Sequence, residues 1–191
     1  MRHPGRLASG IPAVGLALAV LVAACGPSAG PRPAPSEGQL GTIAEAAWAT
    51  TPLTDARSGE AFRLADFAGS VVVVEPMAAW CINCLAQQRE AQVALERLRG
   101  EVPVVYVSLG VDPGEGPEDL AAYSEREGFH WRFAVAGPEV ARALADAFGP
   151  IFLSPPSTPL VVVDPTGQIV FADVGRHSAS ALESLIREAH Q

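Results

Sequence analysis

Apolar and polar residues follow one another in blocks along this chain, and the blocks predict alternating strands and helices. Residues 71–74 are four valines, apolar on both faces and β-branched, which is typical of a central strand in a sheet covered on both sides. Residues 84–98 carry a broken apolar stripe at helical spacing, with Gln and Arg on the opposite face, and Gly100 ends the pattern. A buried strand followed by a helix is therefore expected here.

The rest of the pattern continues this order. Residues 53–60 suggest a short strand and a turn, and residues 164–167 (Asp-Pro-Thr-Gly) read as a hairpin turn between two strands. The order predicts one α/β domain with a mixed central sheet and helices on both faces. Further strands are expected at 102–109, 133–136, 160–163 and 168–174, and further helices at 118–127, 138–148 and 179–189.

The N-terminal region has a different character. A short basic start precedes residues 11–24, which are apolar, uncharged and too few for a comfortable membrane span. Residues 26–41 are rich in Pro, Gly, Ala and Ser and lack a periodic apolar face, as expected for a linker. We expect a signal peptide at 1–24, a tether at 25–47 and an exported globular domain at 48–191.

The end of the apolar segment resembles a bacterial lipoprotein signal, because small residues (Val22-Ala23-Ala24) lead directly to Cys25. The resemblance implies cleavage before Cys25 and lipidation of its sulfur. It also implies a lipoprotein of the cell membrane, with its domain facing the periplasm or the cell exterior. The alternative is an ordinary signal peptide or signal anchor with an incidental cysteine.

Composition and charge exclude some functions. The chain is 49% apolar with a net charge of −8, so nucleic acid is an improbable partner. Of its 3 cysteines, only Cys81 and Cys84 lie in the globular part. A disulfide between them would close too small a loop to stabilise the fold much, and a domain of this length can bury an adequate core without one. Reactivity explains the pair better than stability does.

The pentapeptide Trp80-Cys81-Ile82-Asn83-Cys84 places these two thiols one helical turn apart, directly after the buried strand. If Cys81 lies at the start of the following helix, the helix dipole and the unpaired N–H groups stabilise its thiolate, which is the attacking species in disulfide exchange. Cys84 can then reach back and release a mixed disulfide.

Together with Thr158-Pro159 before a strand and a terminal hairpin and helix, this motif resembles the thioredoxin fold. The resemblance covers residues 49–190 and is nearest to the membrane-tethered, extracytoplasmic TlpA/ResA-like group. It implies a thiol–disulfide oxidoreductase that needs no cofactor beyond a redox-active disulfide. The implied partners are exported proteins with disulfides, for example apocytochrome c or copper-site proteins, and a membrane thiol electron donor; a monomer is expected.

Carried over by position, the resemblance makes Cys81 the exposed nucleophile and Cys84 the buried resolving thiol. Trp80 flanks the site, and Pro159 matches a cis-proline whose preceding residue, Thr158, offers its backbone to an extended substrate. Glu75 falls where this group places a buried acid beneath the disulfide.

An acid that ends a run of valines is costly to bury unless it has a task, such as taking the proton of a buried thiol through water. The alternative is that Glu75 lies past the strand end in solvent. Ile82 and Asn83 tune the redox poise, and no cation lies between the cysteines. We therefore expect a moderately lowered pKa for Cys81 and a reductant rather than a strong oxidant.

A second resemblance, to Sco-type copper proteins of the same fold, rests on residues 107–113 and 117–123. Those proteins bind copper through Cys-x-x-x-Cys and a distant histidine. The cysteine spacing here is one residue shorter, and Ser154 to Pro159 occupy the stretch where that histidine is expected. His177 could complete a soft metal site with two thiolates, although a helix start with Ser178 is its simpler role.

Peroxiredoxins are a third possibility within this fold. They need a threonine three residues before the reactive cysteine, and that position is Ala78. Peroxidase activity and a resident metal are therefore not expected.

Overall fold

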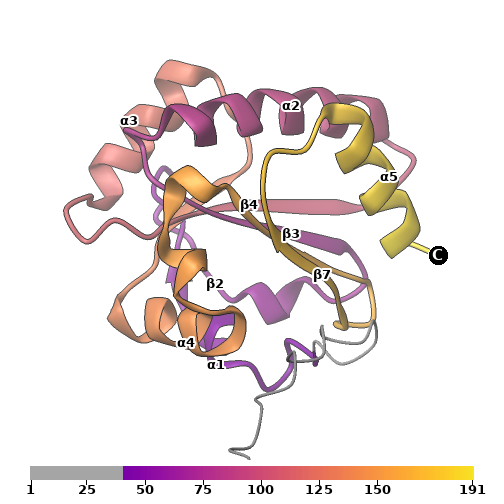
Figure 1. Ribbon diagram of the computed structural model, residues 1–191, viewed down its shortest axis with the longest axis horizontal. Coiled ribbons are helices and arrows are strands. Elements are labelled where there is room, and N and C mark those ends of the chain that lie inside the picture. Colours follow the sequence, from indigo (N-terminus) through magenta and orange to yellow (C-terminus); the bar gives the residue numbers. More distant parts are fainter. Residues whose placement is uncertain (1–40) are drawn as a thin grey trace, which may run out of the picture. The chain divides into compact units, whose positions relative to one another are not determined.

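The computed structural model describes residues 41–191, and its centre is a five-stranded mixed sheet in the order β5-β4-β3-β6-β7 (Figure 1). The middle strand, β3 (Val71–Met77), pairs in parallel with β4 (Val104–Gly110), which pairs in parallel with β5 (Arg132–Val135). On its other side β3 pairs antiparallel with β6 (Pro159–Val163), and β6 with β7 (Ile169–Val174). The predicted mixed sheet is confirmed.

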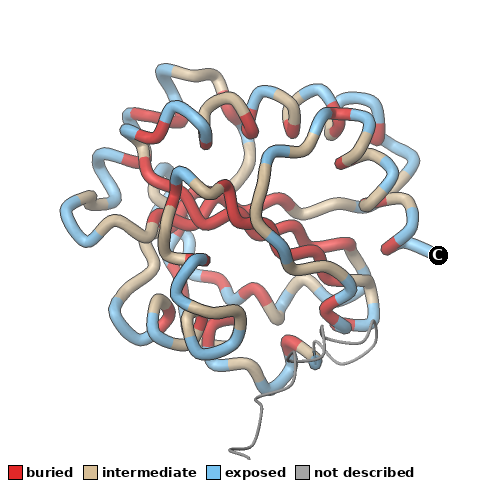
Figure 2. Tube along the Cα trace, viewed as in Figure 1, coloured by how far each residue is buried: buried red, intermediate tan, exposed pale blue. Residues whose placement is uncertain are grey.

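The valines of β3 explain why this strand lies in the middle, because their side chains alternate between two apolar layers. Val71 and Val73 pack on one face and Val72 and Val74 on the other, and all are buried (Figure 2). The strand continues beyond the valine run through Glu75 and Pro76 to Met77, and these residues are buried as well.

Helices cover both faces of the sheet, as predicted (Figure 1). α2 (Ile82–Leu98), α3 (Pro117–Glu127) and α5 (Ala179–Ala189) lie on the face of Val71, Val73 and Met77. α1 (Ala47–Thr50) and α4 (Pro138–Phe148) lie on the opposite face. The bounds of α4 and α5 agree with the prediction, while α2 begins two residues earlier because Cys81 caps it.

Short elements complete the fold. β1 (Leu53–Thr54) is the short strand expected within residues 53–60, and it pairs after a turn with β2 (Ala61–Phe62), which was not predicted. α1 and three 3₁₀ turns, η1 (Leu64–Phe67), η2 (Pro150–Leu153) and η3 (Pro155–Ser157), were not predicted. Each is too short to show a hydrophobic period.

The packed chain starts before the expected boundary at residue 48. Thr42 forms a β-bridge with Gln168, the Ile43 N–H donates to the Gly167 carbonyl at 2.9 Å, and the Ile43 side chain is buried. The predicted signal peptide, Cys25 and most of the predicted tether lie outside the described residues. Within residues 41–191, no helix has both the length and the apolar character needed to cross a membrane.

Candidate redox site

Cys81 and Cys84 form a disulfide at the start of α2, with their Cα atoms 5.3 Å apart. Cys81 is the N-cap residue of the helix, and its Sγ accepts a hydrogen bond from the Cys84 N–H at 3.1 Å. The first N–H groups of a helix lack intrahelical partners and carry partial positive charge. Cys81 therefore lies at the start of the helix, the position on which the predicted stabilisation of its thiolate depends.

The exposure of Cys81 differs from the prediction of an exposed nucleophile. Cys81 is only 3% exposed, and Cys84 is fully buried. In the disulfide form the Cys81 sulfur turns inward and packs in the cluster that contains Met77 and Ala78. The accessible surface beside the sulfurs belongs instead to Trp80, 59% exposed, and Ile82, 77% exposed.

A proline turn lies against the other sulfur. The Cys84 Sγ is 3.2 Å from the Pro155 carbonyl oxygen, and the Asn83 amide donates to the Pro156 carbonyl at 3.0 Å. In the dithiol form the Cys84 thiol can donate to Pro155, which favours its neutral form. The two cysteines therefore have opposite environments. The proline turn was not predicted from the sequence, although Pro155-Pro156 precedes the predicted Thr-Pro pair.

Thr158 does not offer the free backbone that was predicted. Its N–H donates to the Pro155 carbonyl at 2.9 Å, and its carbonyl accepts from the Gly175 N–H at 3.2 Å. The residue is 2% exposed and has the left-handed backbone angle φ 48°. The 3₁₀ turn η3 ends at Thr158 and turns its peptide groups inward. Pro159 begins β6, as expected.

Glu75 is fully buried on the α2 side of the sheet, so the alternative that it lies in solvent is wrong. Tyr106 O–H donates to its Oε2 at 3.0 Å, and Ser108 lies at 3.5 Å, while Oε1 has no partner among the described residues. Burial raises the pKa of Glu75 to about 8, because hydrogen bonds from Gln88, Tyr106 and Ser108 offset the desolvation only in part. The carboxyl group is mainly protonated at neutral pH.

Polar side chains connect Glu75 to the helix that carries the disulfide. Gln88 lies one turn after Cys84 on α2, donates to Ser108 at 3.2 Å and accepts from the Tyr123 hydroxyl at 2.6 Å. Trp131 Nε1 also donates to Ser108, at 2.9 Å. The sequence analysis missed this network, although its signal is visible in a serine within an apolar strand and a glutamine on a buried helix face.

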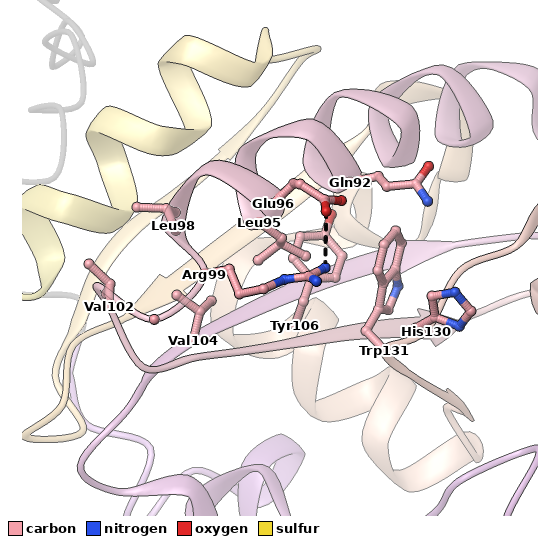
Figure 3. Close-up of a pocket in the computed structure, with 11 residues that line it drawn as sticks. Gln92, Leu95, Glu96, Leu98, Arg99, Val102, Val104, Tyr106, His130 and Trp131 are labelled. Atoms are coloured by element: carbon pink, nitrogen blue, oxygen red, sulfur yellow. Dashed lines mark ion pairs between the residues drawn. The ribbon is translucent and has the colours of Figure 1, made fainter.

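Two members of this network, Tyr106 and Trp131, also line a groove of about 420 Å³ (Figure 3). Leu95 of α2 and Arg99, the residue that follows the helix, line the groove as well. None of the predicted site residues lines this groove. Tyr106 therefore separates the groove from Glu75, since its ring faces the groove and its hydroxyl binds the acid.

Two carboxylates hold the loop before Cys81. Both carboxylate oxygens of Glu115 accept from the Ala79 N–H, at 2.9 and 3.0 Å, and Asp112 accepts from Trp80 Nε1. Hydrogen bonds from Trp80 and the Gly114 N–H hold the pKa of Asp112 below its usual value. Asp112 belongs to the first of the two segments that resembled Sco proteins, and Glu115 lies between the two; the role of these carboxylates was not predicted.

His177 has the simpler of its two predicted roles. Its backbone N–H donates to Gln87 at 2.7 Å, its ring packs edge-on against Phe171, and Ser178 caps α5. Within residues 41–191, no three His, Cys, Asp or Glu side chains lie close enough together to hold a metal ion. Ala78, where a peroxiredoxin needs threonine, is buried.

No protein-family model and no curated protein sequence matches this chain. Solved structures do match it. A thiol:disulfide interchange protein of the thioredoxin family from Chlorobium tepidum TLS is 18% identical, with 73% of this chain and 92% of that chain covered and a TM-score of 0.59. The thioredoxin domain of a thiol-disulfide oxidoreductase from Bacteroides vulgatus is also 18% identical, over 72% and 91% of the two chains, with a TM-score of 0.59.

A copper-bound ScoI from Arabidopsis thaliana is 14% identical, over 72% of this chain and 94% of that one, with a TM-score of 0.58. Likeness at these identities establishes the fold. The chain has the thioredoxin-like fold, as its sequence indicated, and that fold serves more than one chemistry.

Proposed function

We propose that this chain is a thiol–disulfide oxidoreductase that reduces disulfides in partner proteins. The observation that carries the proposal is the position of Cys81. Its sulfur caps α2 and accepts the Cys84 N–H, while the Cys84 sulfur faces the Pro155 carbonyl. This asymmetry gives the pair one stabilised thiolate and one neutral thiol, the arrangement that stepwise exchange needs.

In the first step, the Cys81 thiolate of the dithiol form attacks one sulfur of the partner disulfide. The partner S–S bond breaks as the bond between Cys81 and the partner forms. The second partner sulfur leaves as a thiolate and takes a proton from water. No net electron transfer to solvent occurs, and a mixed disulfide joins the two proteins.

In the second step, Cys84 loses its proton and its thiolate attacks the Cys81 sulfur. The Cys81–Cys84 bond forms as the bond between Cys81 and the partner breaks, and the partner sulfur leaves as a thiolate that takes a proton from water. The partner then holds two thiols and has been reduced by two electrons. Glu75 is the base we assign to this step. It accepts the proton from its ionised fraction, which is a minority at neutral pH, and its pKa of about 8 is close to that of an ordinary thiol. Glu75 is linked through Ser108 to Gln88, one turn after Cys84 on α2, and a water molecule between Cys84 and Glu75 would carry the proton.

The remaining parts of the proposal come from the sequence. An exported domain anchored through lipidated Cys25 would act at the outer side of the cell membrane on exported proteins, for example apocytochrome c or copper-site proteins. A membrane dithiol carrier would return two electrons to the Cys81–Cys84 disulfide. We expect the protein to work as a monomer.

The proposal is tested with purified Cys25→Ser protein, which keeps only the two site cysteines. Equilibration with thiol–disulfide buffers should give a single two-electron couple, and the reduced protein should reduce a protein disulfide such as that of insulin. Cu(I) and Cu(II) titrations run in parallel. Inert cysteines would overturn the proposal, as would stoichiometric Cu(II) binding that is lost in His177→Ala, which would favour a copper carrier.

A further inference from the structure

The surface beside the disulfide is apolar to an unusual degree. Trp80 and Ile82, the two neighbours of Cys81 in sequence, are 59% and 77% exposed. These are the highest values among the large apolar side chains of the described residues. Exposed apolar groups that adjoin a reactive centre indicate a contact surface, because they gain free energy when a partner covers them.

Negative charge borders this surface on the Trp80 side. The chain between Arg99 and Arg126 contains no basic residue. Its carboxylates are tied to the redox loop, since Asp112 binds Trp80 and Glu115 binds Ala79. The acidic margin, as we call it, consists of Asp112, Glu115, Glu118 and Asp119.

The charge of the acidic margin is not neutralised by the protein itself. The ion pairs of the described residues all involve other carboxylates. Glu118 is exposed and accepts no hydrogen bond from the described residues, and its carboxylate lies beside Gly116. Glu118 and Asp119 are exposed, Asp112 and Glu115 are half-buried against the redox loop, and none of the four has an ion-pair partner among the described residues.

The opposite border of the surface is different. There Asn83 binds the Pro156 carbonyl, and the Gly175 N–H binds the Ser157 carbonyl, which places exposed Arg176 near this side. The contact surface is thus acidic beside Trp80, while the basic residue Arg176 lies near the Pro156 side. A partner with basic residues is attracted chiefly to the Trp80 side of the disulfide.

We propose that the site selects cationic substrates, namely polypeptide segments whose disulfide cysteine lies between an apolar residue and Lys or Arg. The apolar residue packs on Trp80 and Ile82, and the basic residues lie against the acidic margin. The inference rests on the proposed oxidoreductase function. Complementary charge acts chiefly on association, so it raises the rate of encounter and weakens as salt increases.

The test compares two peptide disulfides that differ only in the residues flanking cysteine, two Arg in one and two Glu in the other. The reduced Cys25→Ser protein should show a kcat/KM at least about tenfold higher for the Arg peptide at low ionic strength. The ratio should fall toward one in high salt. Rates with a small thiol such as dithiothreitol correct for the intrinsic reactivity of each peptide.

Charge reversal locates the effect. Glu118→Arg should lower the Arg-to-Glu rate ratio about threefold or more, and the rate with a small neutral disulfide, measured in parallel, separates this effect from a general loss of activity. Glu125→Arg makes the same charge change farther along α3, at another exposed glutamate with no ion pair in the described chain, and should change the ratio much less.

Equal corrected rates for the two peptides, or a preference that salt and Glu118→Arg leave unchanged, would overturn the selection of cationic substrates while the oxidoreductase function stands. Failure to reduce either peptide or the small disulfide would instead remove the proposed function itself. The two failures are therefore distinguishable.

Discussion

The Asn83 side chain donates to the Pro156 carbonyl at 3.0 Å, so the dipeptide between the cysteines is fastened to the turn that covers the Cys84 sulfur. Residues inside a Cys-x-x-Cys motif are usually considered for their effect on the helix terminus. In this protein one of them also holds a second segment, 73 residues away in sequence, against the disulfide.

Removal of this contact should loosen the turn. Asn83→Ala is expected to lower the free energy of unfolding by about 1 kcal/mol, the usual net value of such a hydrogen bond. Hydrogen exchange at the Ser157 and Thr158 amides should become faster. Exchange at the β3 amides should change only as much as the free energy of global unfolding changes. Ile82→Ala is the matched control, because its exposed side chain makes no hydrogen bond to the turn. Unchanged exchange at both amides in Asn83→Ala would show that the contact does not hold the turn.

Glu75 should make the stability of the protein depend on pH. The folded pKa of about 8 is above the ordinary value of 4.5, so the folded state keeps a proton that the unfolded state releases between these values. Protonated Glu75 contributes its full stabilisation to the folded state below pH 4.5, and this contribution is lost as the pH rises through 8. The free energy of unfolding should therefore fall by up to about 5 kcal/mol as pH rises through this interval.

Chemical denaturation at several pH values measures this effect. Glu75→Gln, which cannot ionise, should show a flatter profile than the parent protein. Glu118→Gln removes an exposed carboxylate instead and should keep the parent slope. The same slope in Glu75→Gln and the parent would mean that the buried acid does not contribute.

The Tyr106 hydroxyl should lower the pKa of Glu75, because it donates to the ionised carboxylate. In Tyr106→Phe the ¹³C carboxyl titration of Glu75 is therefore expected to move above its value of about 8 in the parent. Ser124→Ala is the control, since that hydroxyl donates to the Ala121 carbonyl and makes no contact with Glu75 or Gln88. A downward shift in Tyr106→Phe would contradict the assignment of this donor.

The two cysteines should behave differently when one is removed. Cys84→Ala leaves Cys81 able to attack but removes the thiol that releases the partner, so mixed disulfides should accumulate. They can be trapped in cells by acid quenching and seen on non-reducing gels. Cys81→Ala should trap far fewer, because Cys84 is fully buried. Equal trapping by both variants would show that the roles are not separated.

Much of the fold was predictable from local patterns. The valine run identified β3, and the helical periods of α4 and α5 gave their bounds. The burial of Glu75 could be anticipated as well, because Glu75 directly follows the valine run that predicted the buried strand. These features depend on residues that are neighbours in sequence.

The missed features depend on contacts between distant segments. Glu115 binds the Ala79 N–H across 36 residues, and nothing in the sequence near either residue indicates the contact. Thr158 resembled a docking residue by position, but the turn η3 and Gly175 use both of its backbone groups. The exposure of Cys81 was overestimated because the direction of a side chain in a disulfide depends on its partner.

Pro76 explains why the sheet leaves space for the redox site. The β3–β6 ladder runs from Val72 to Val74 and stops there, whereas the β3–β4 ladder continues to Met77. Proline has no N–H to give to a ladder, so β6 gains nothing by following β3 further. The pairing of these two strands ends at this point, and η3 also contacts β3. A residue without a backbone N–H thus limits the pairing of β3 with β6. The sheet stays open at this end, where the disulfide meets the proline turn.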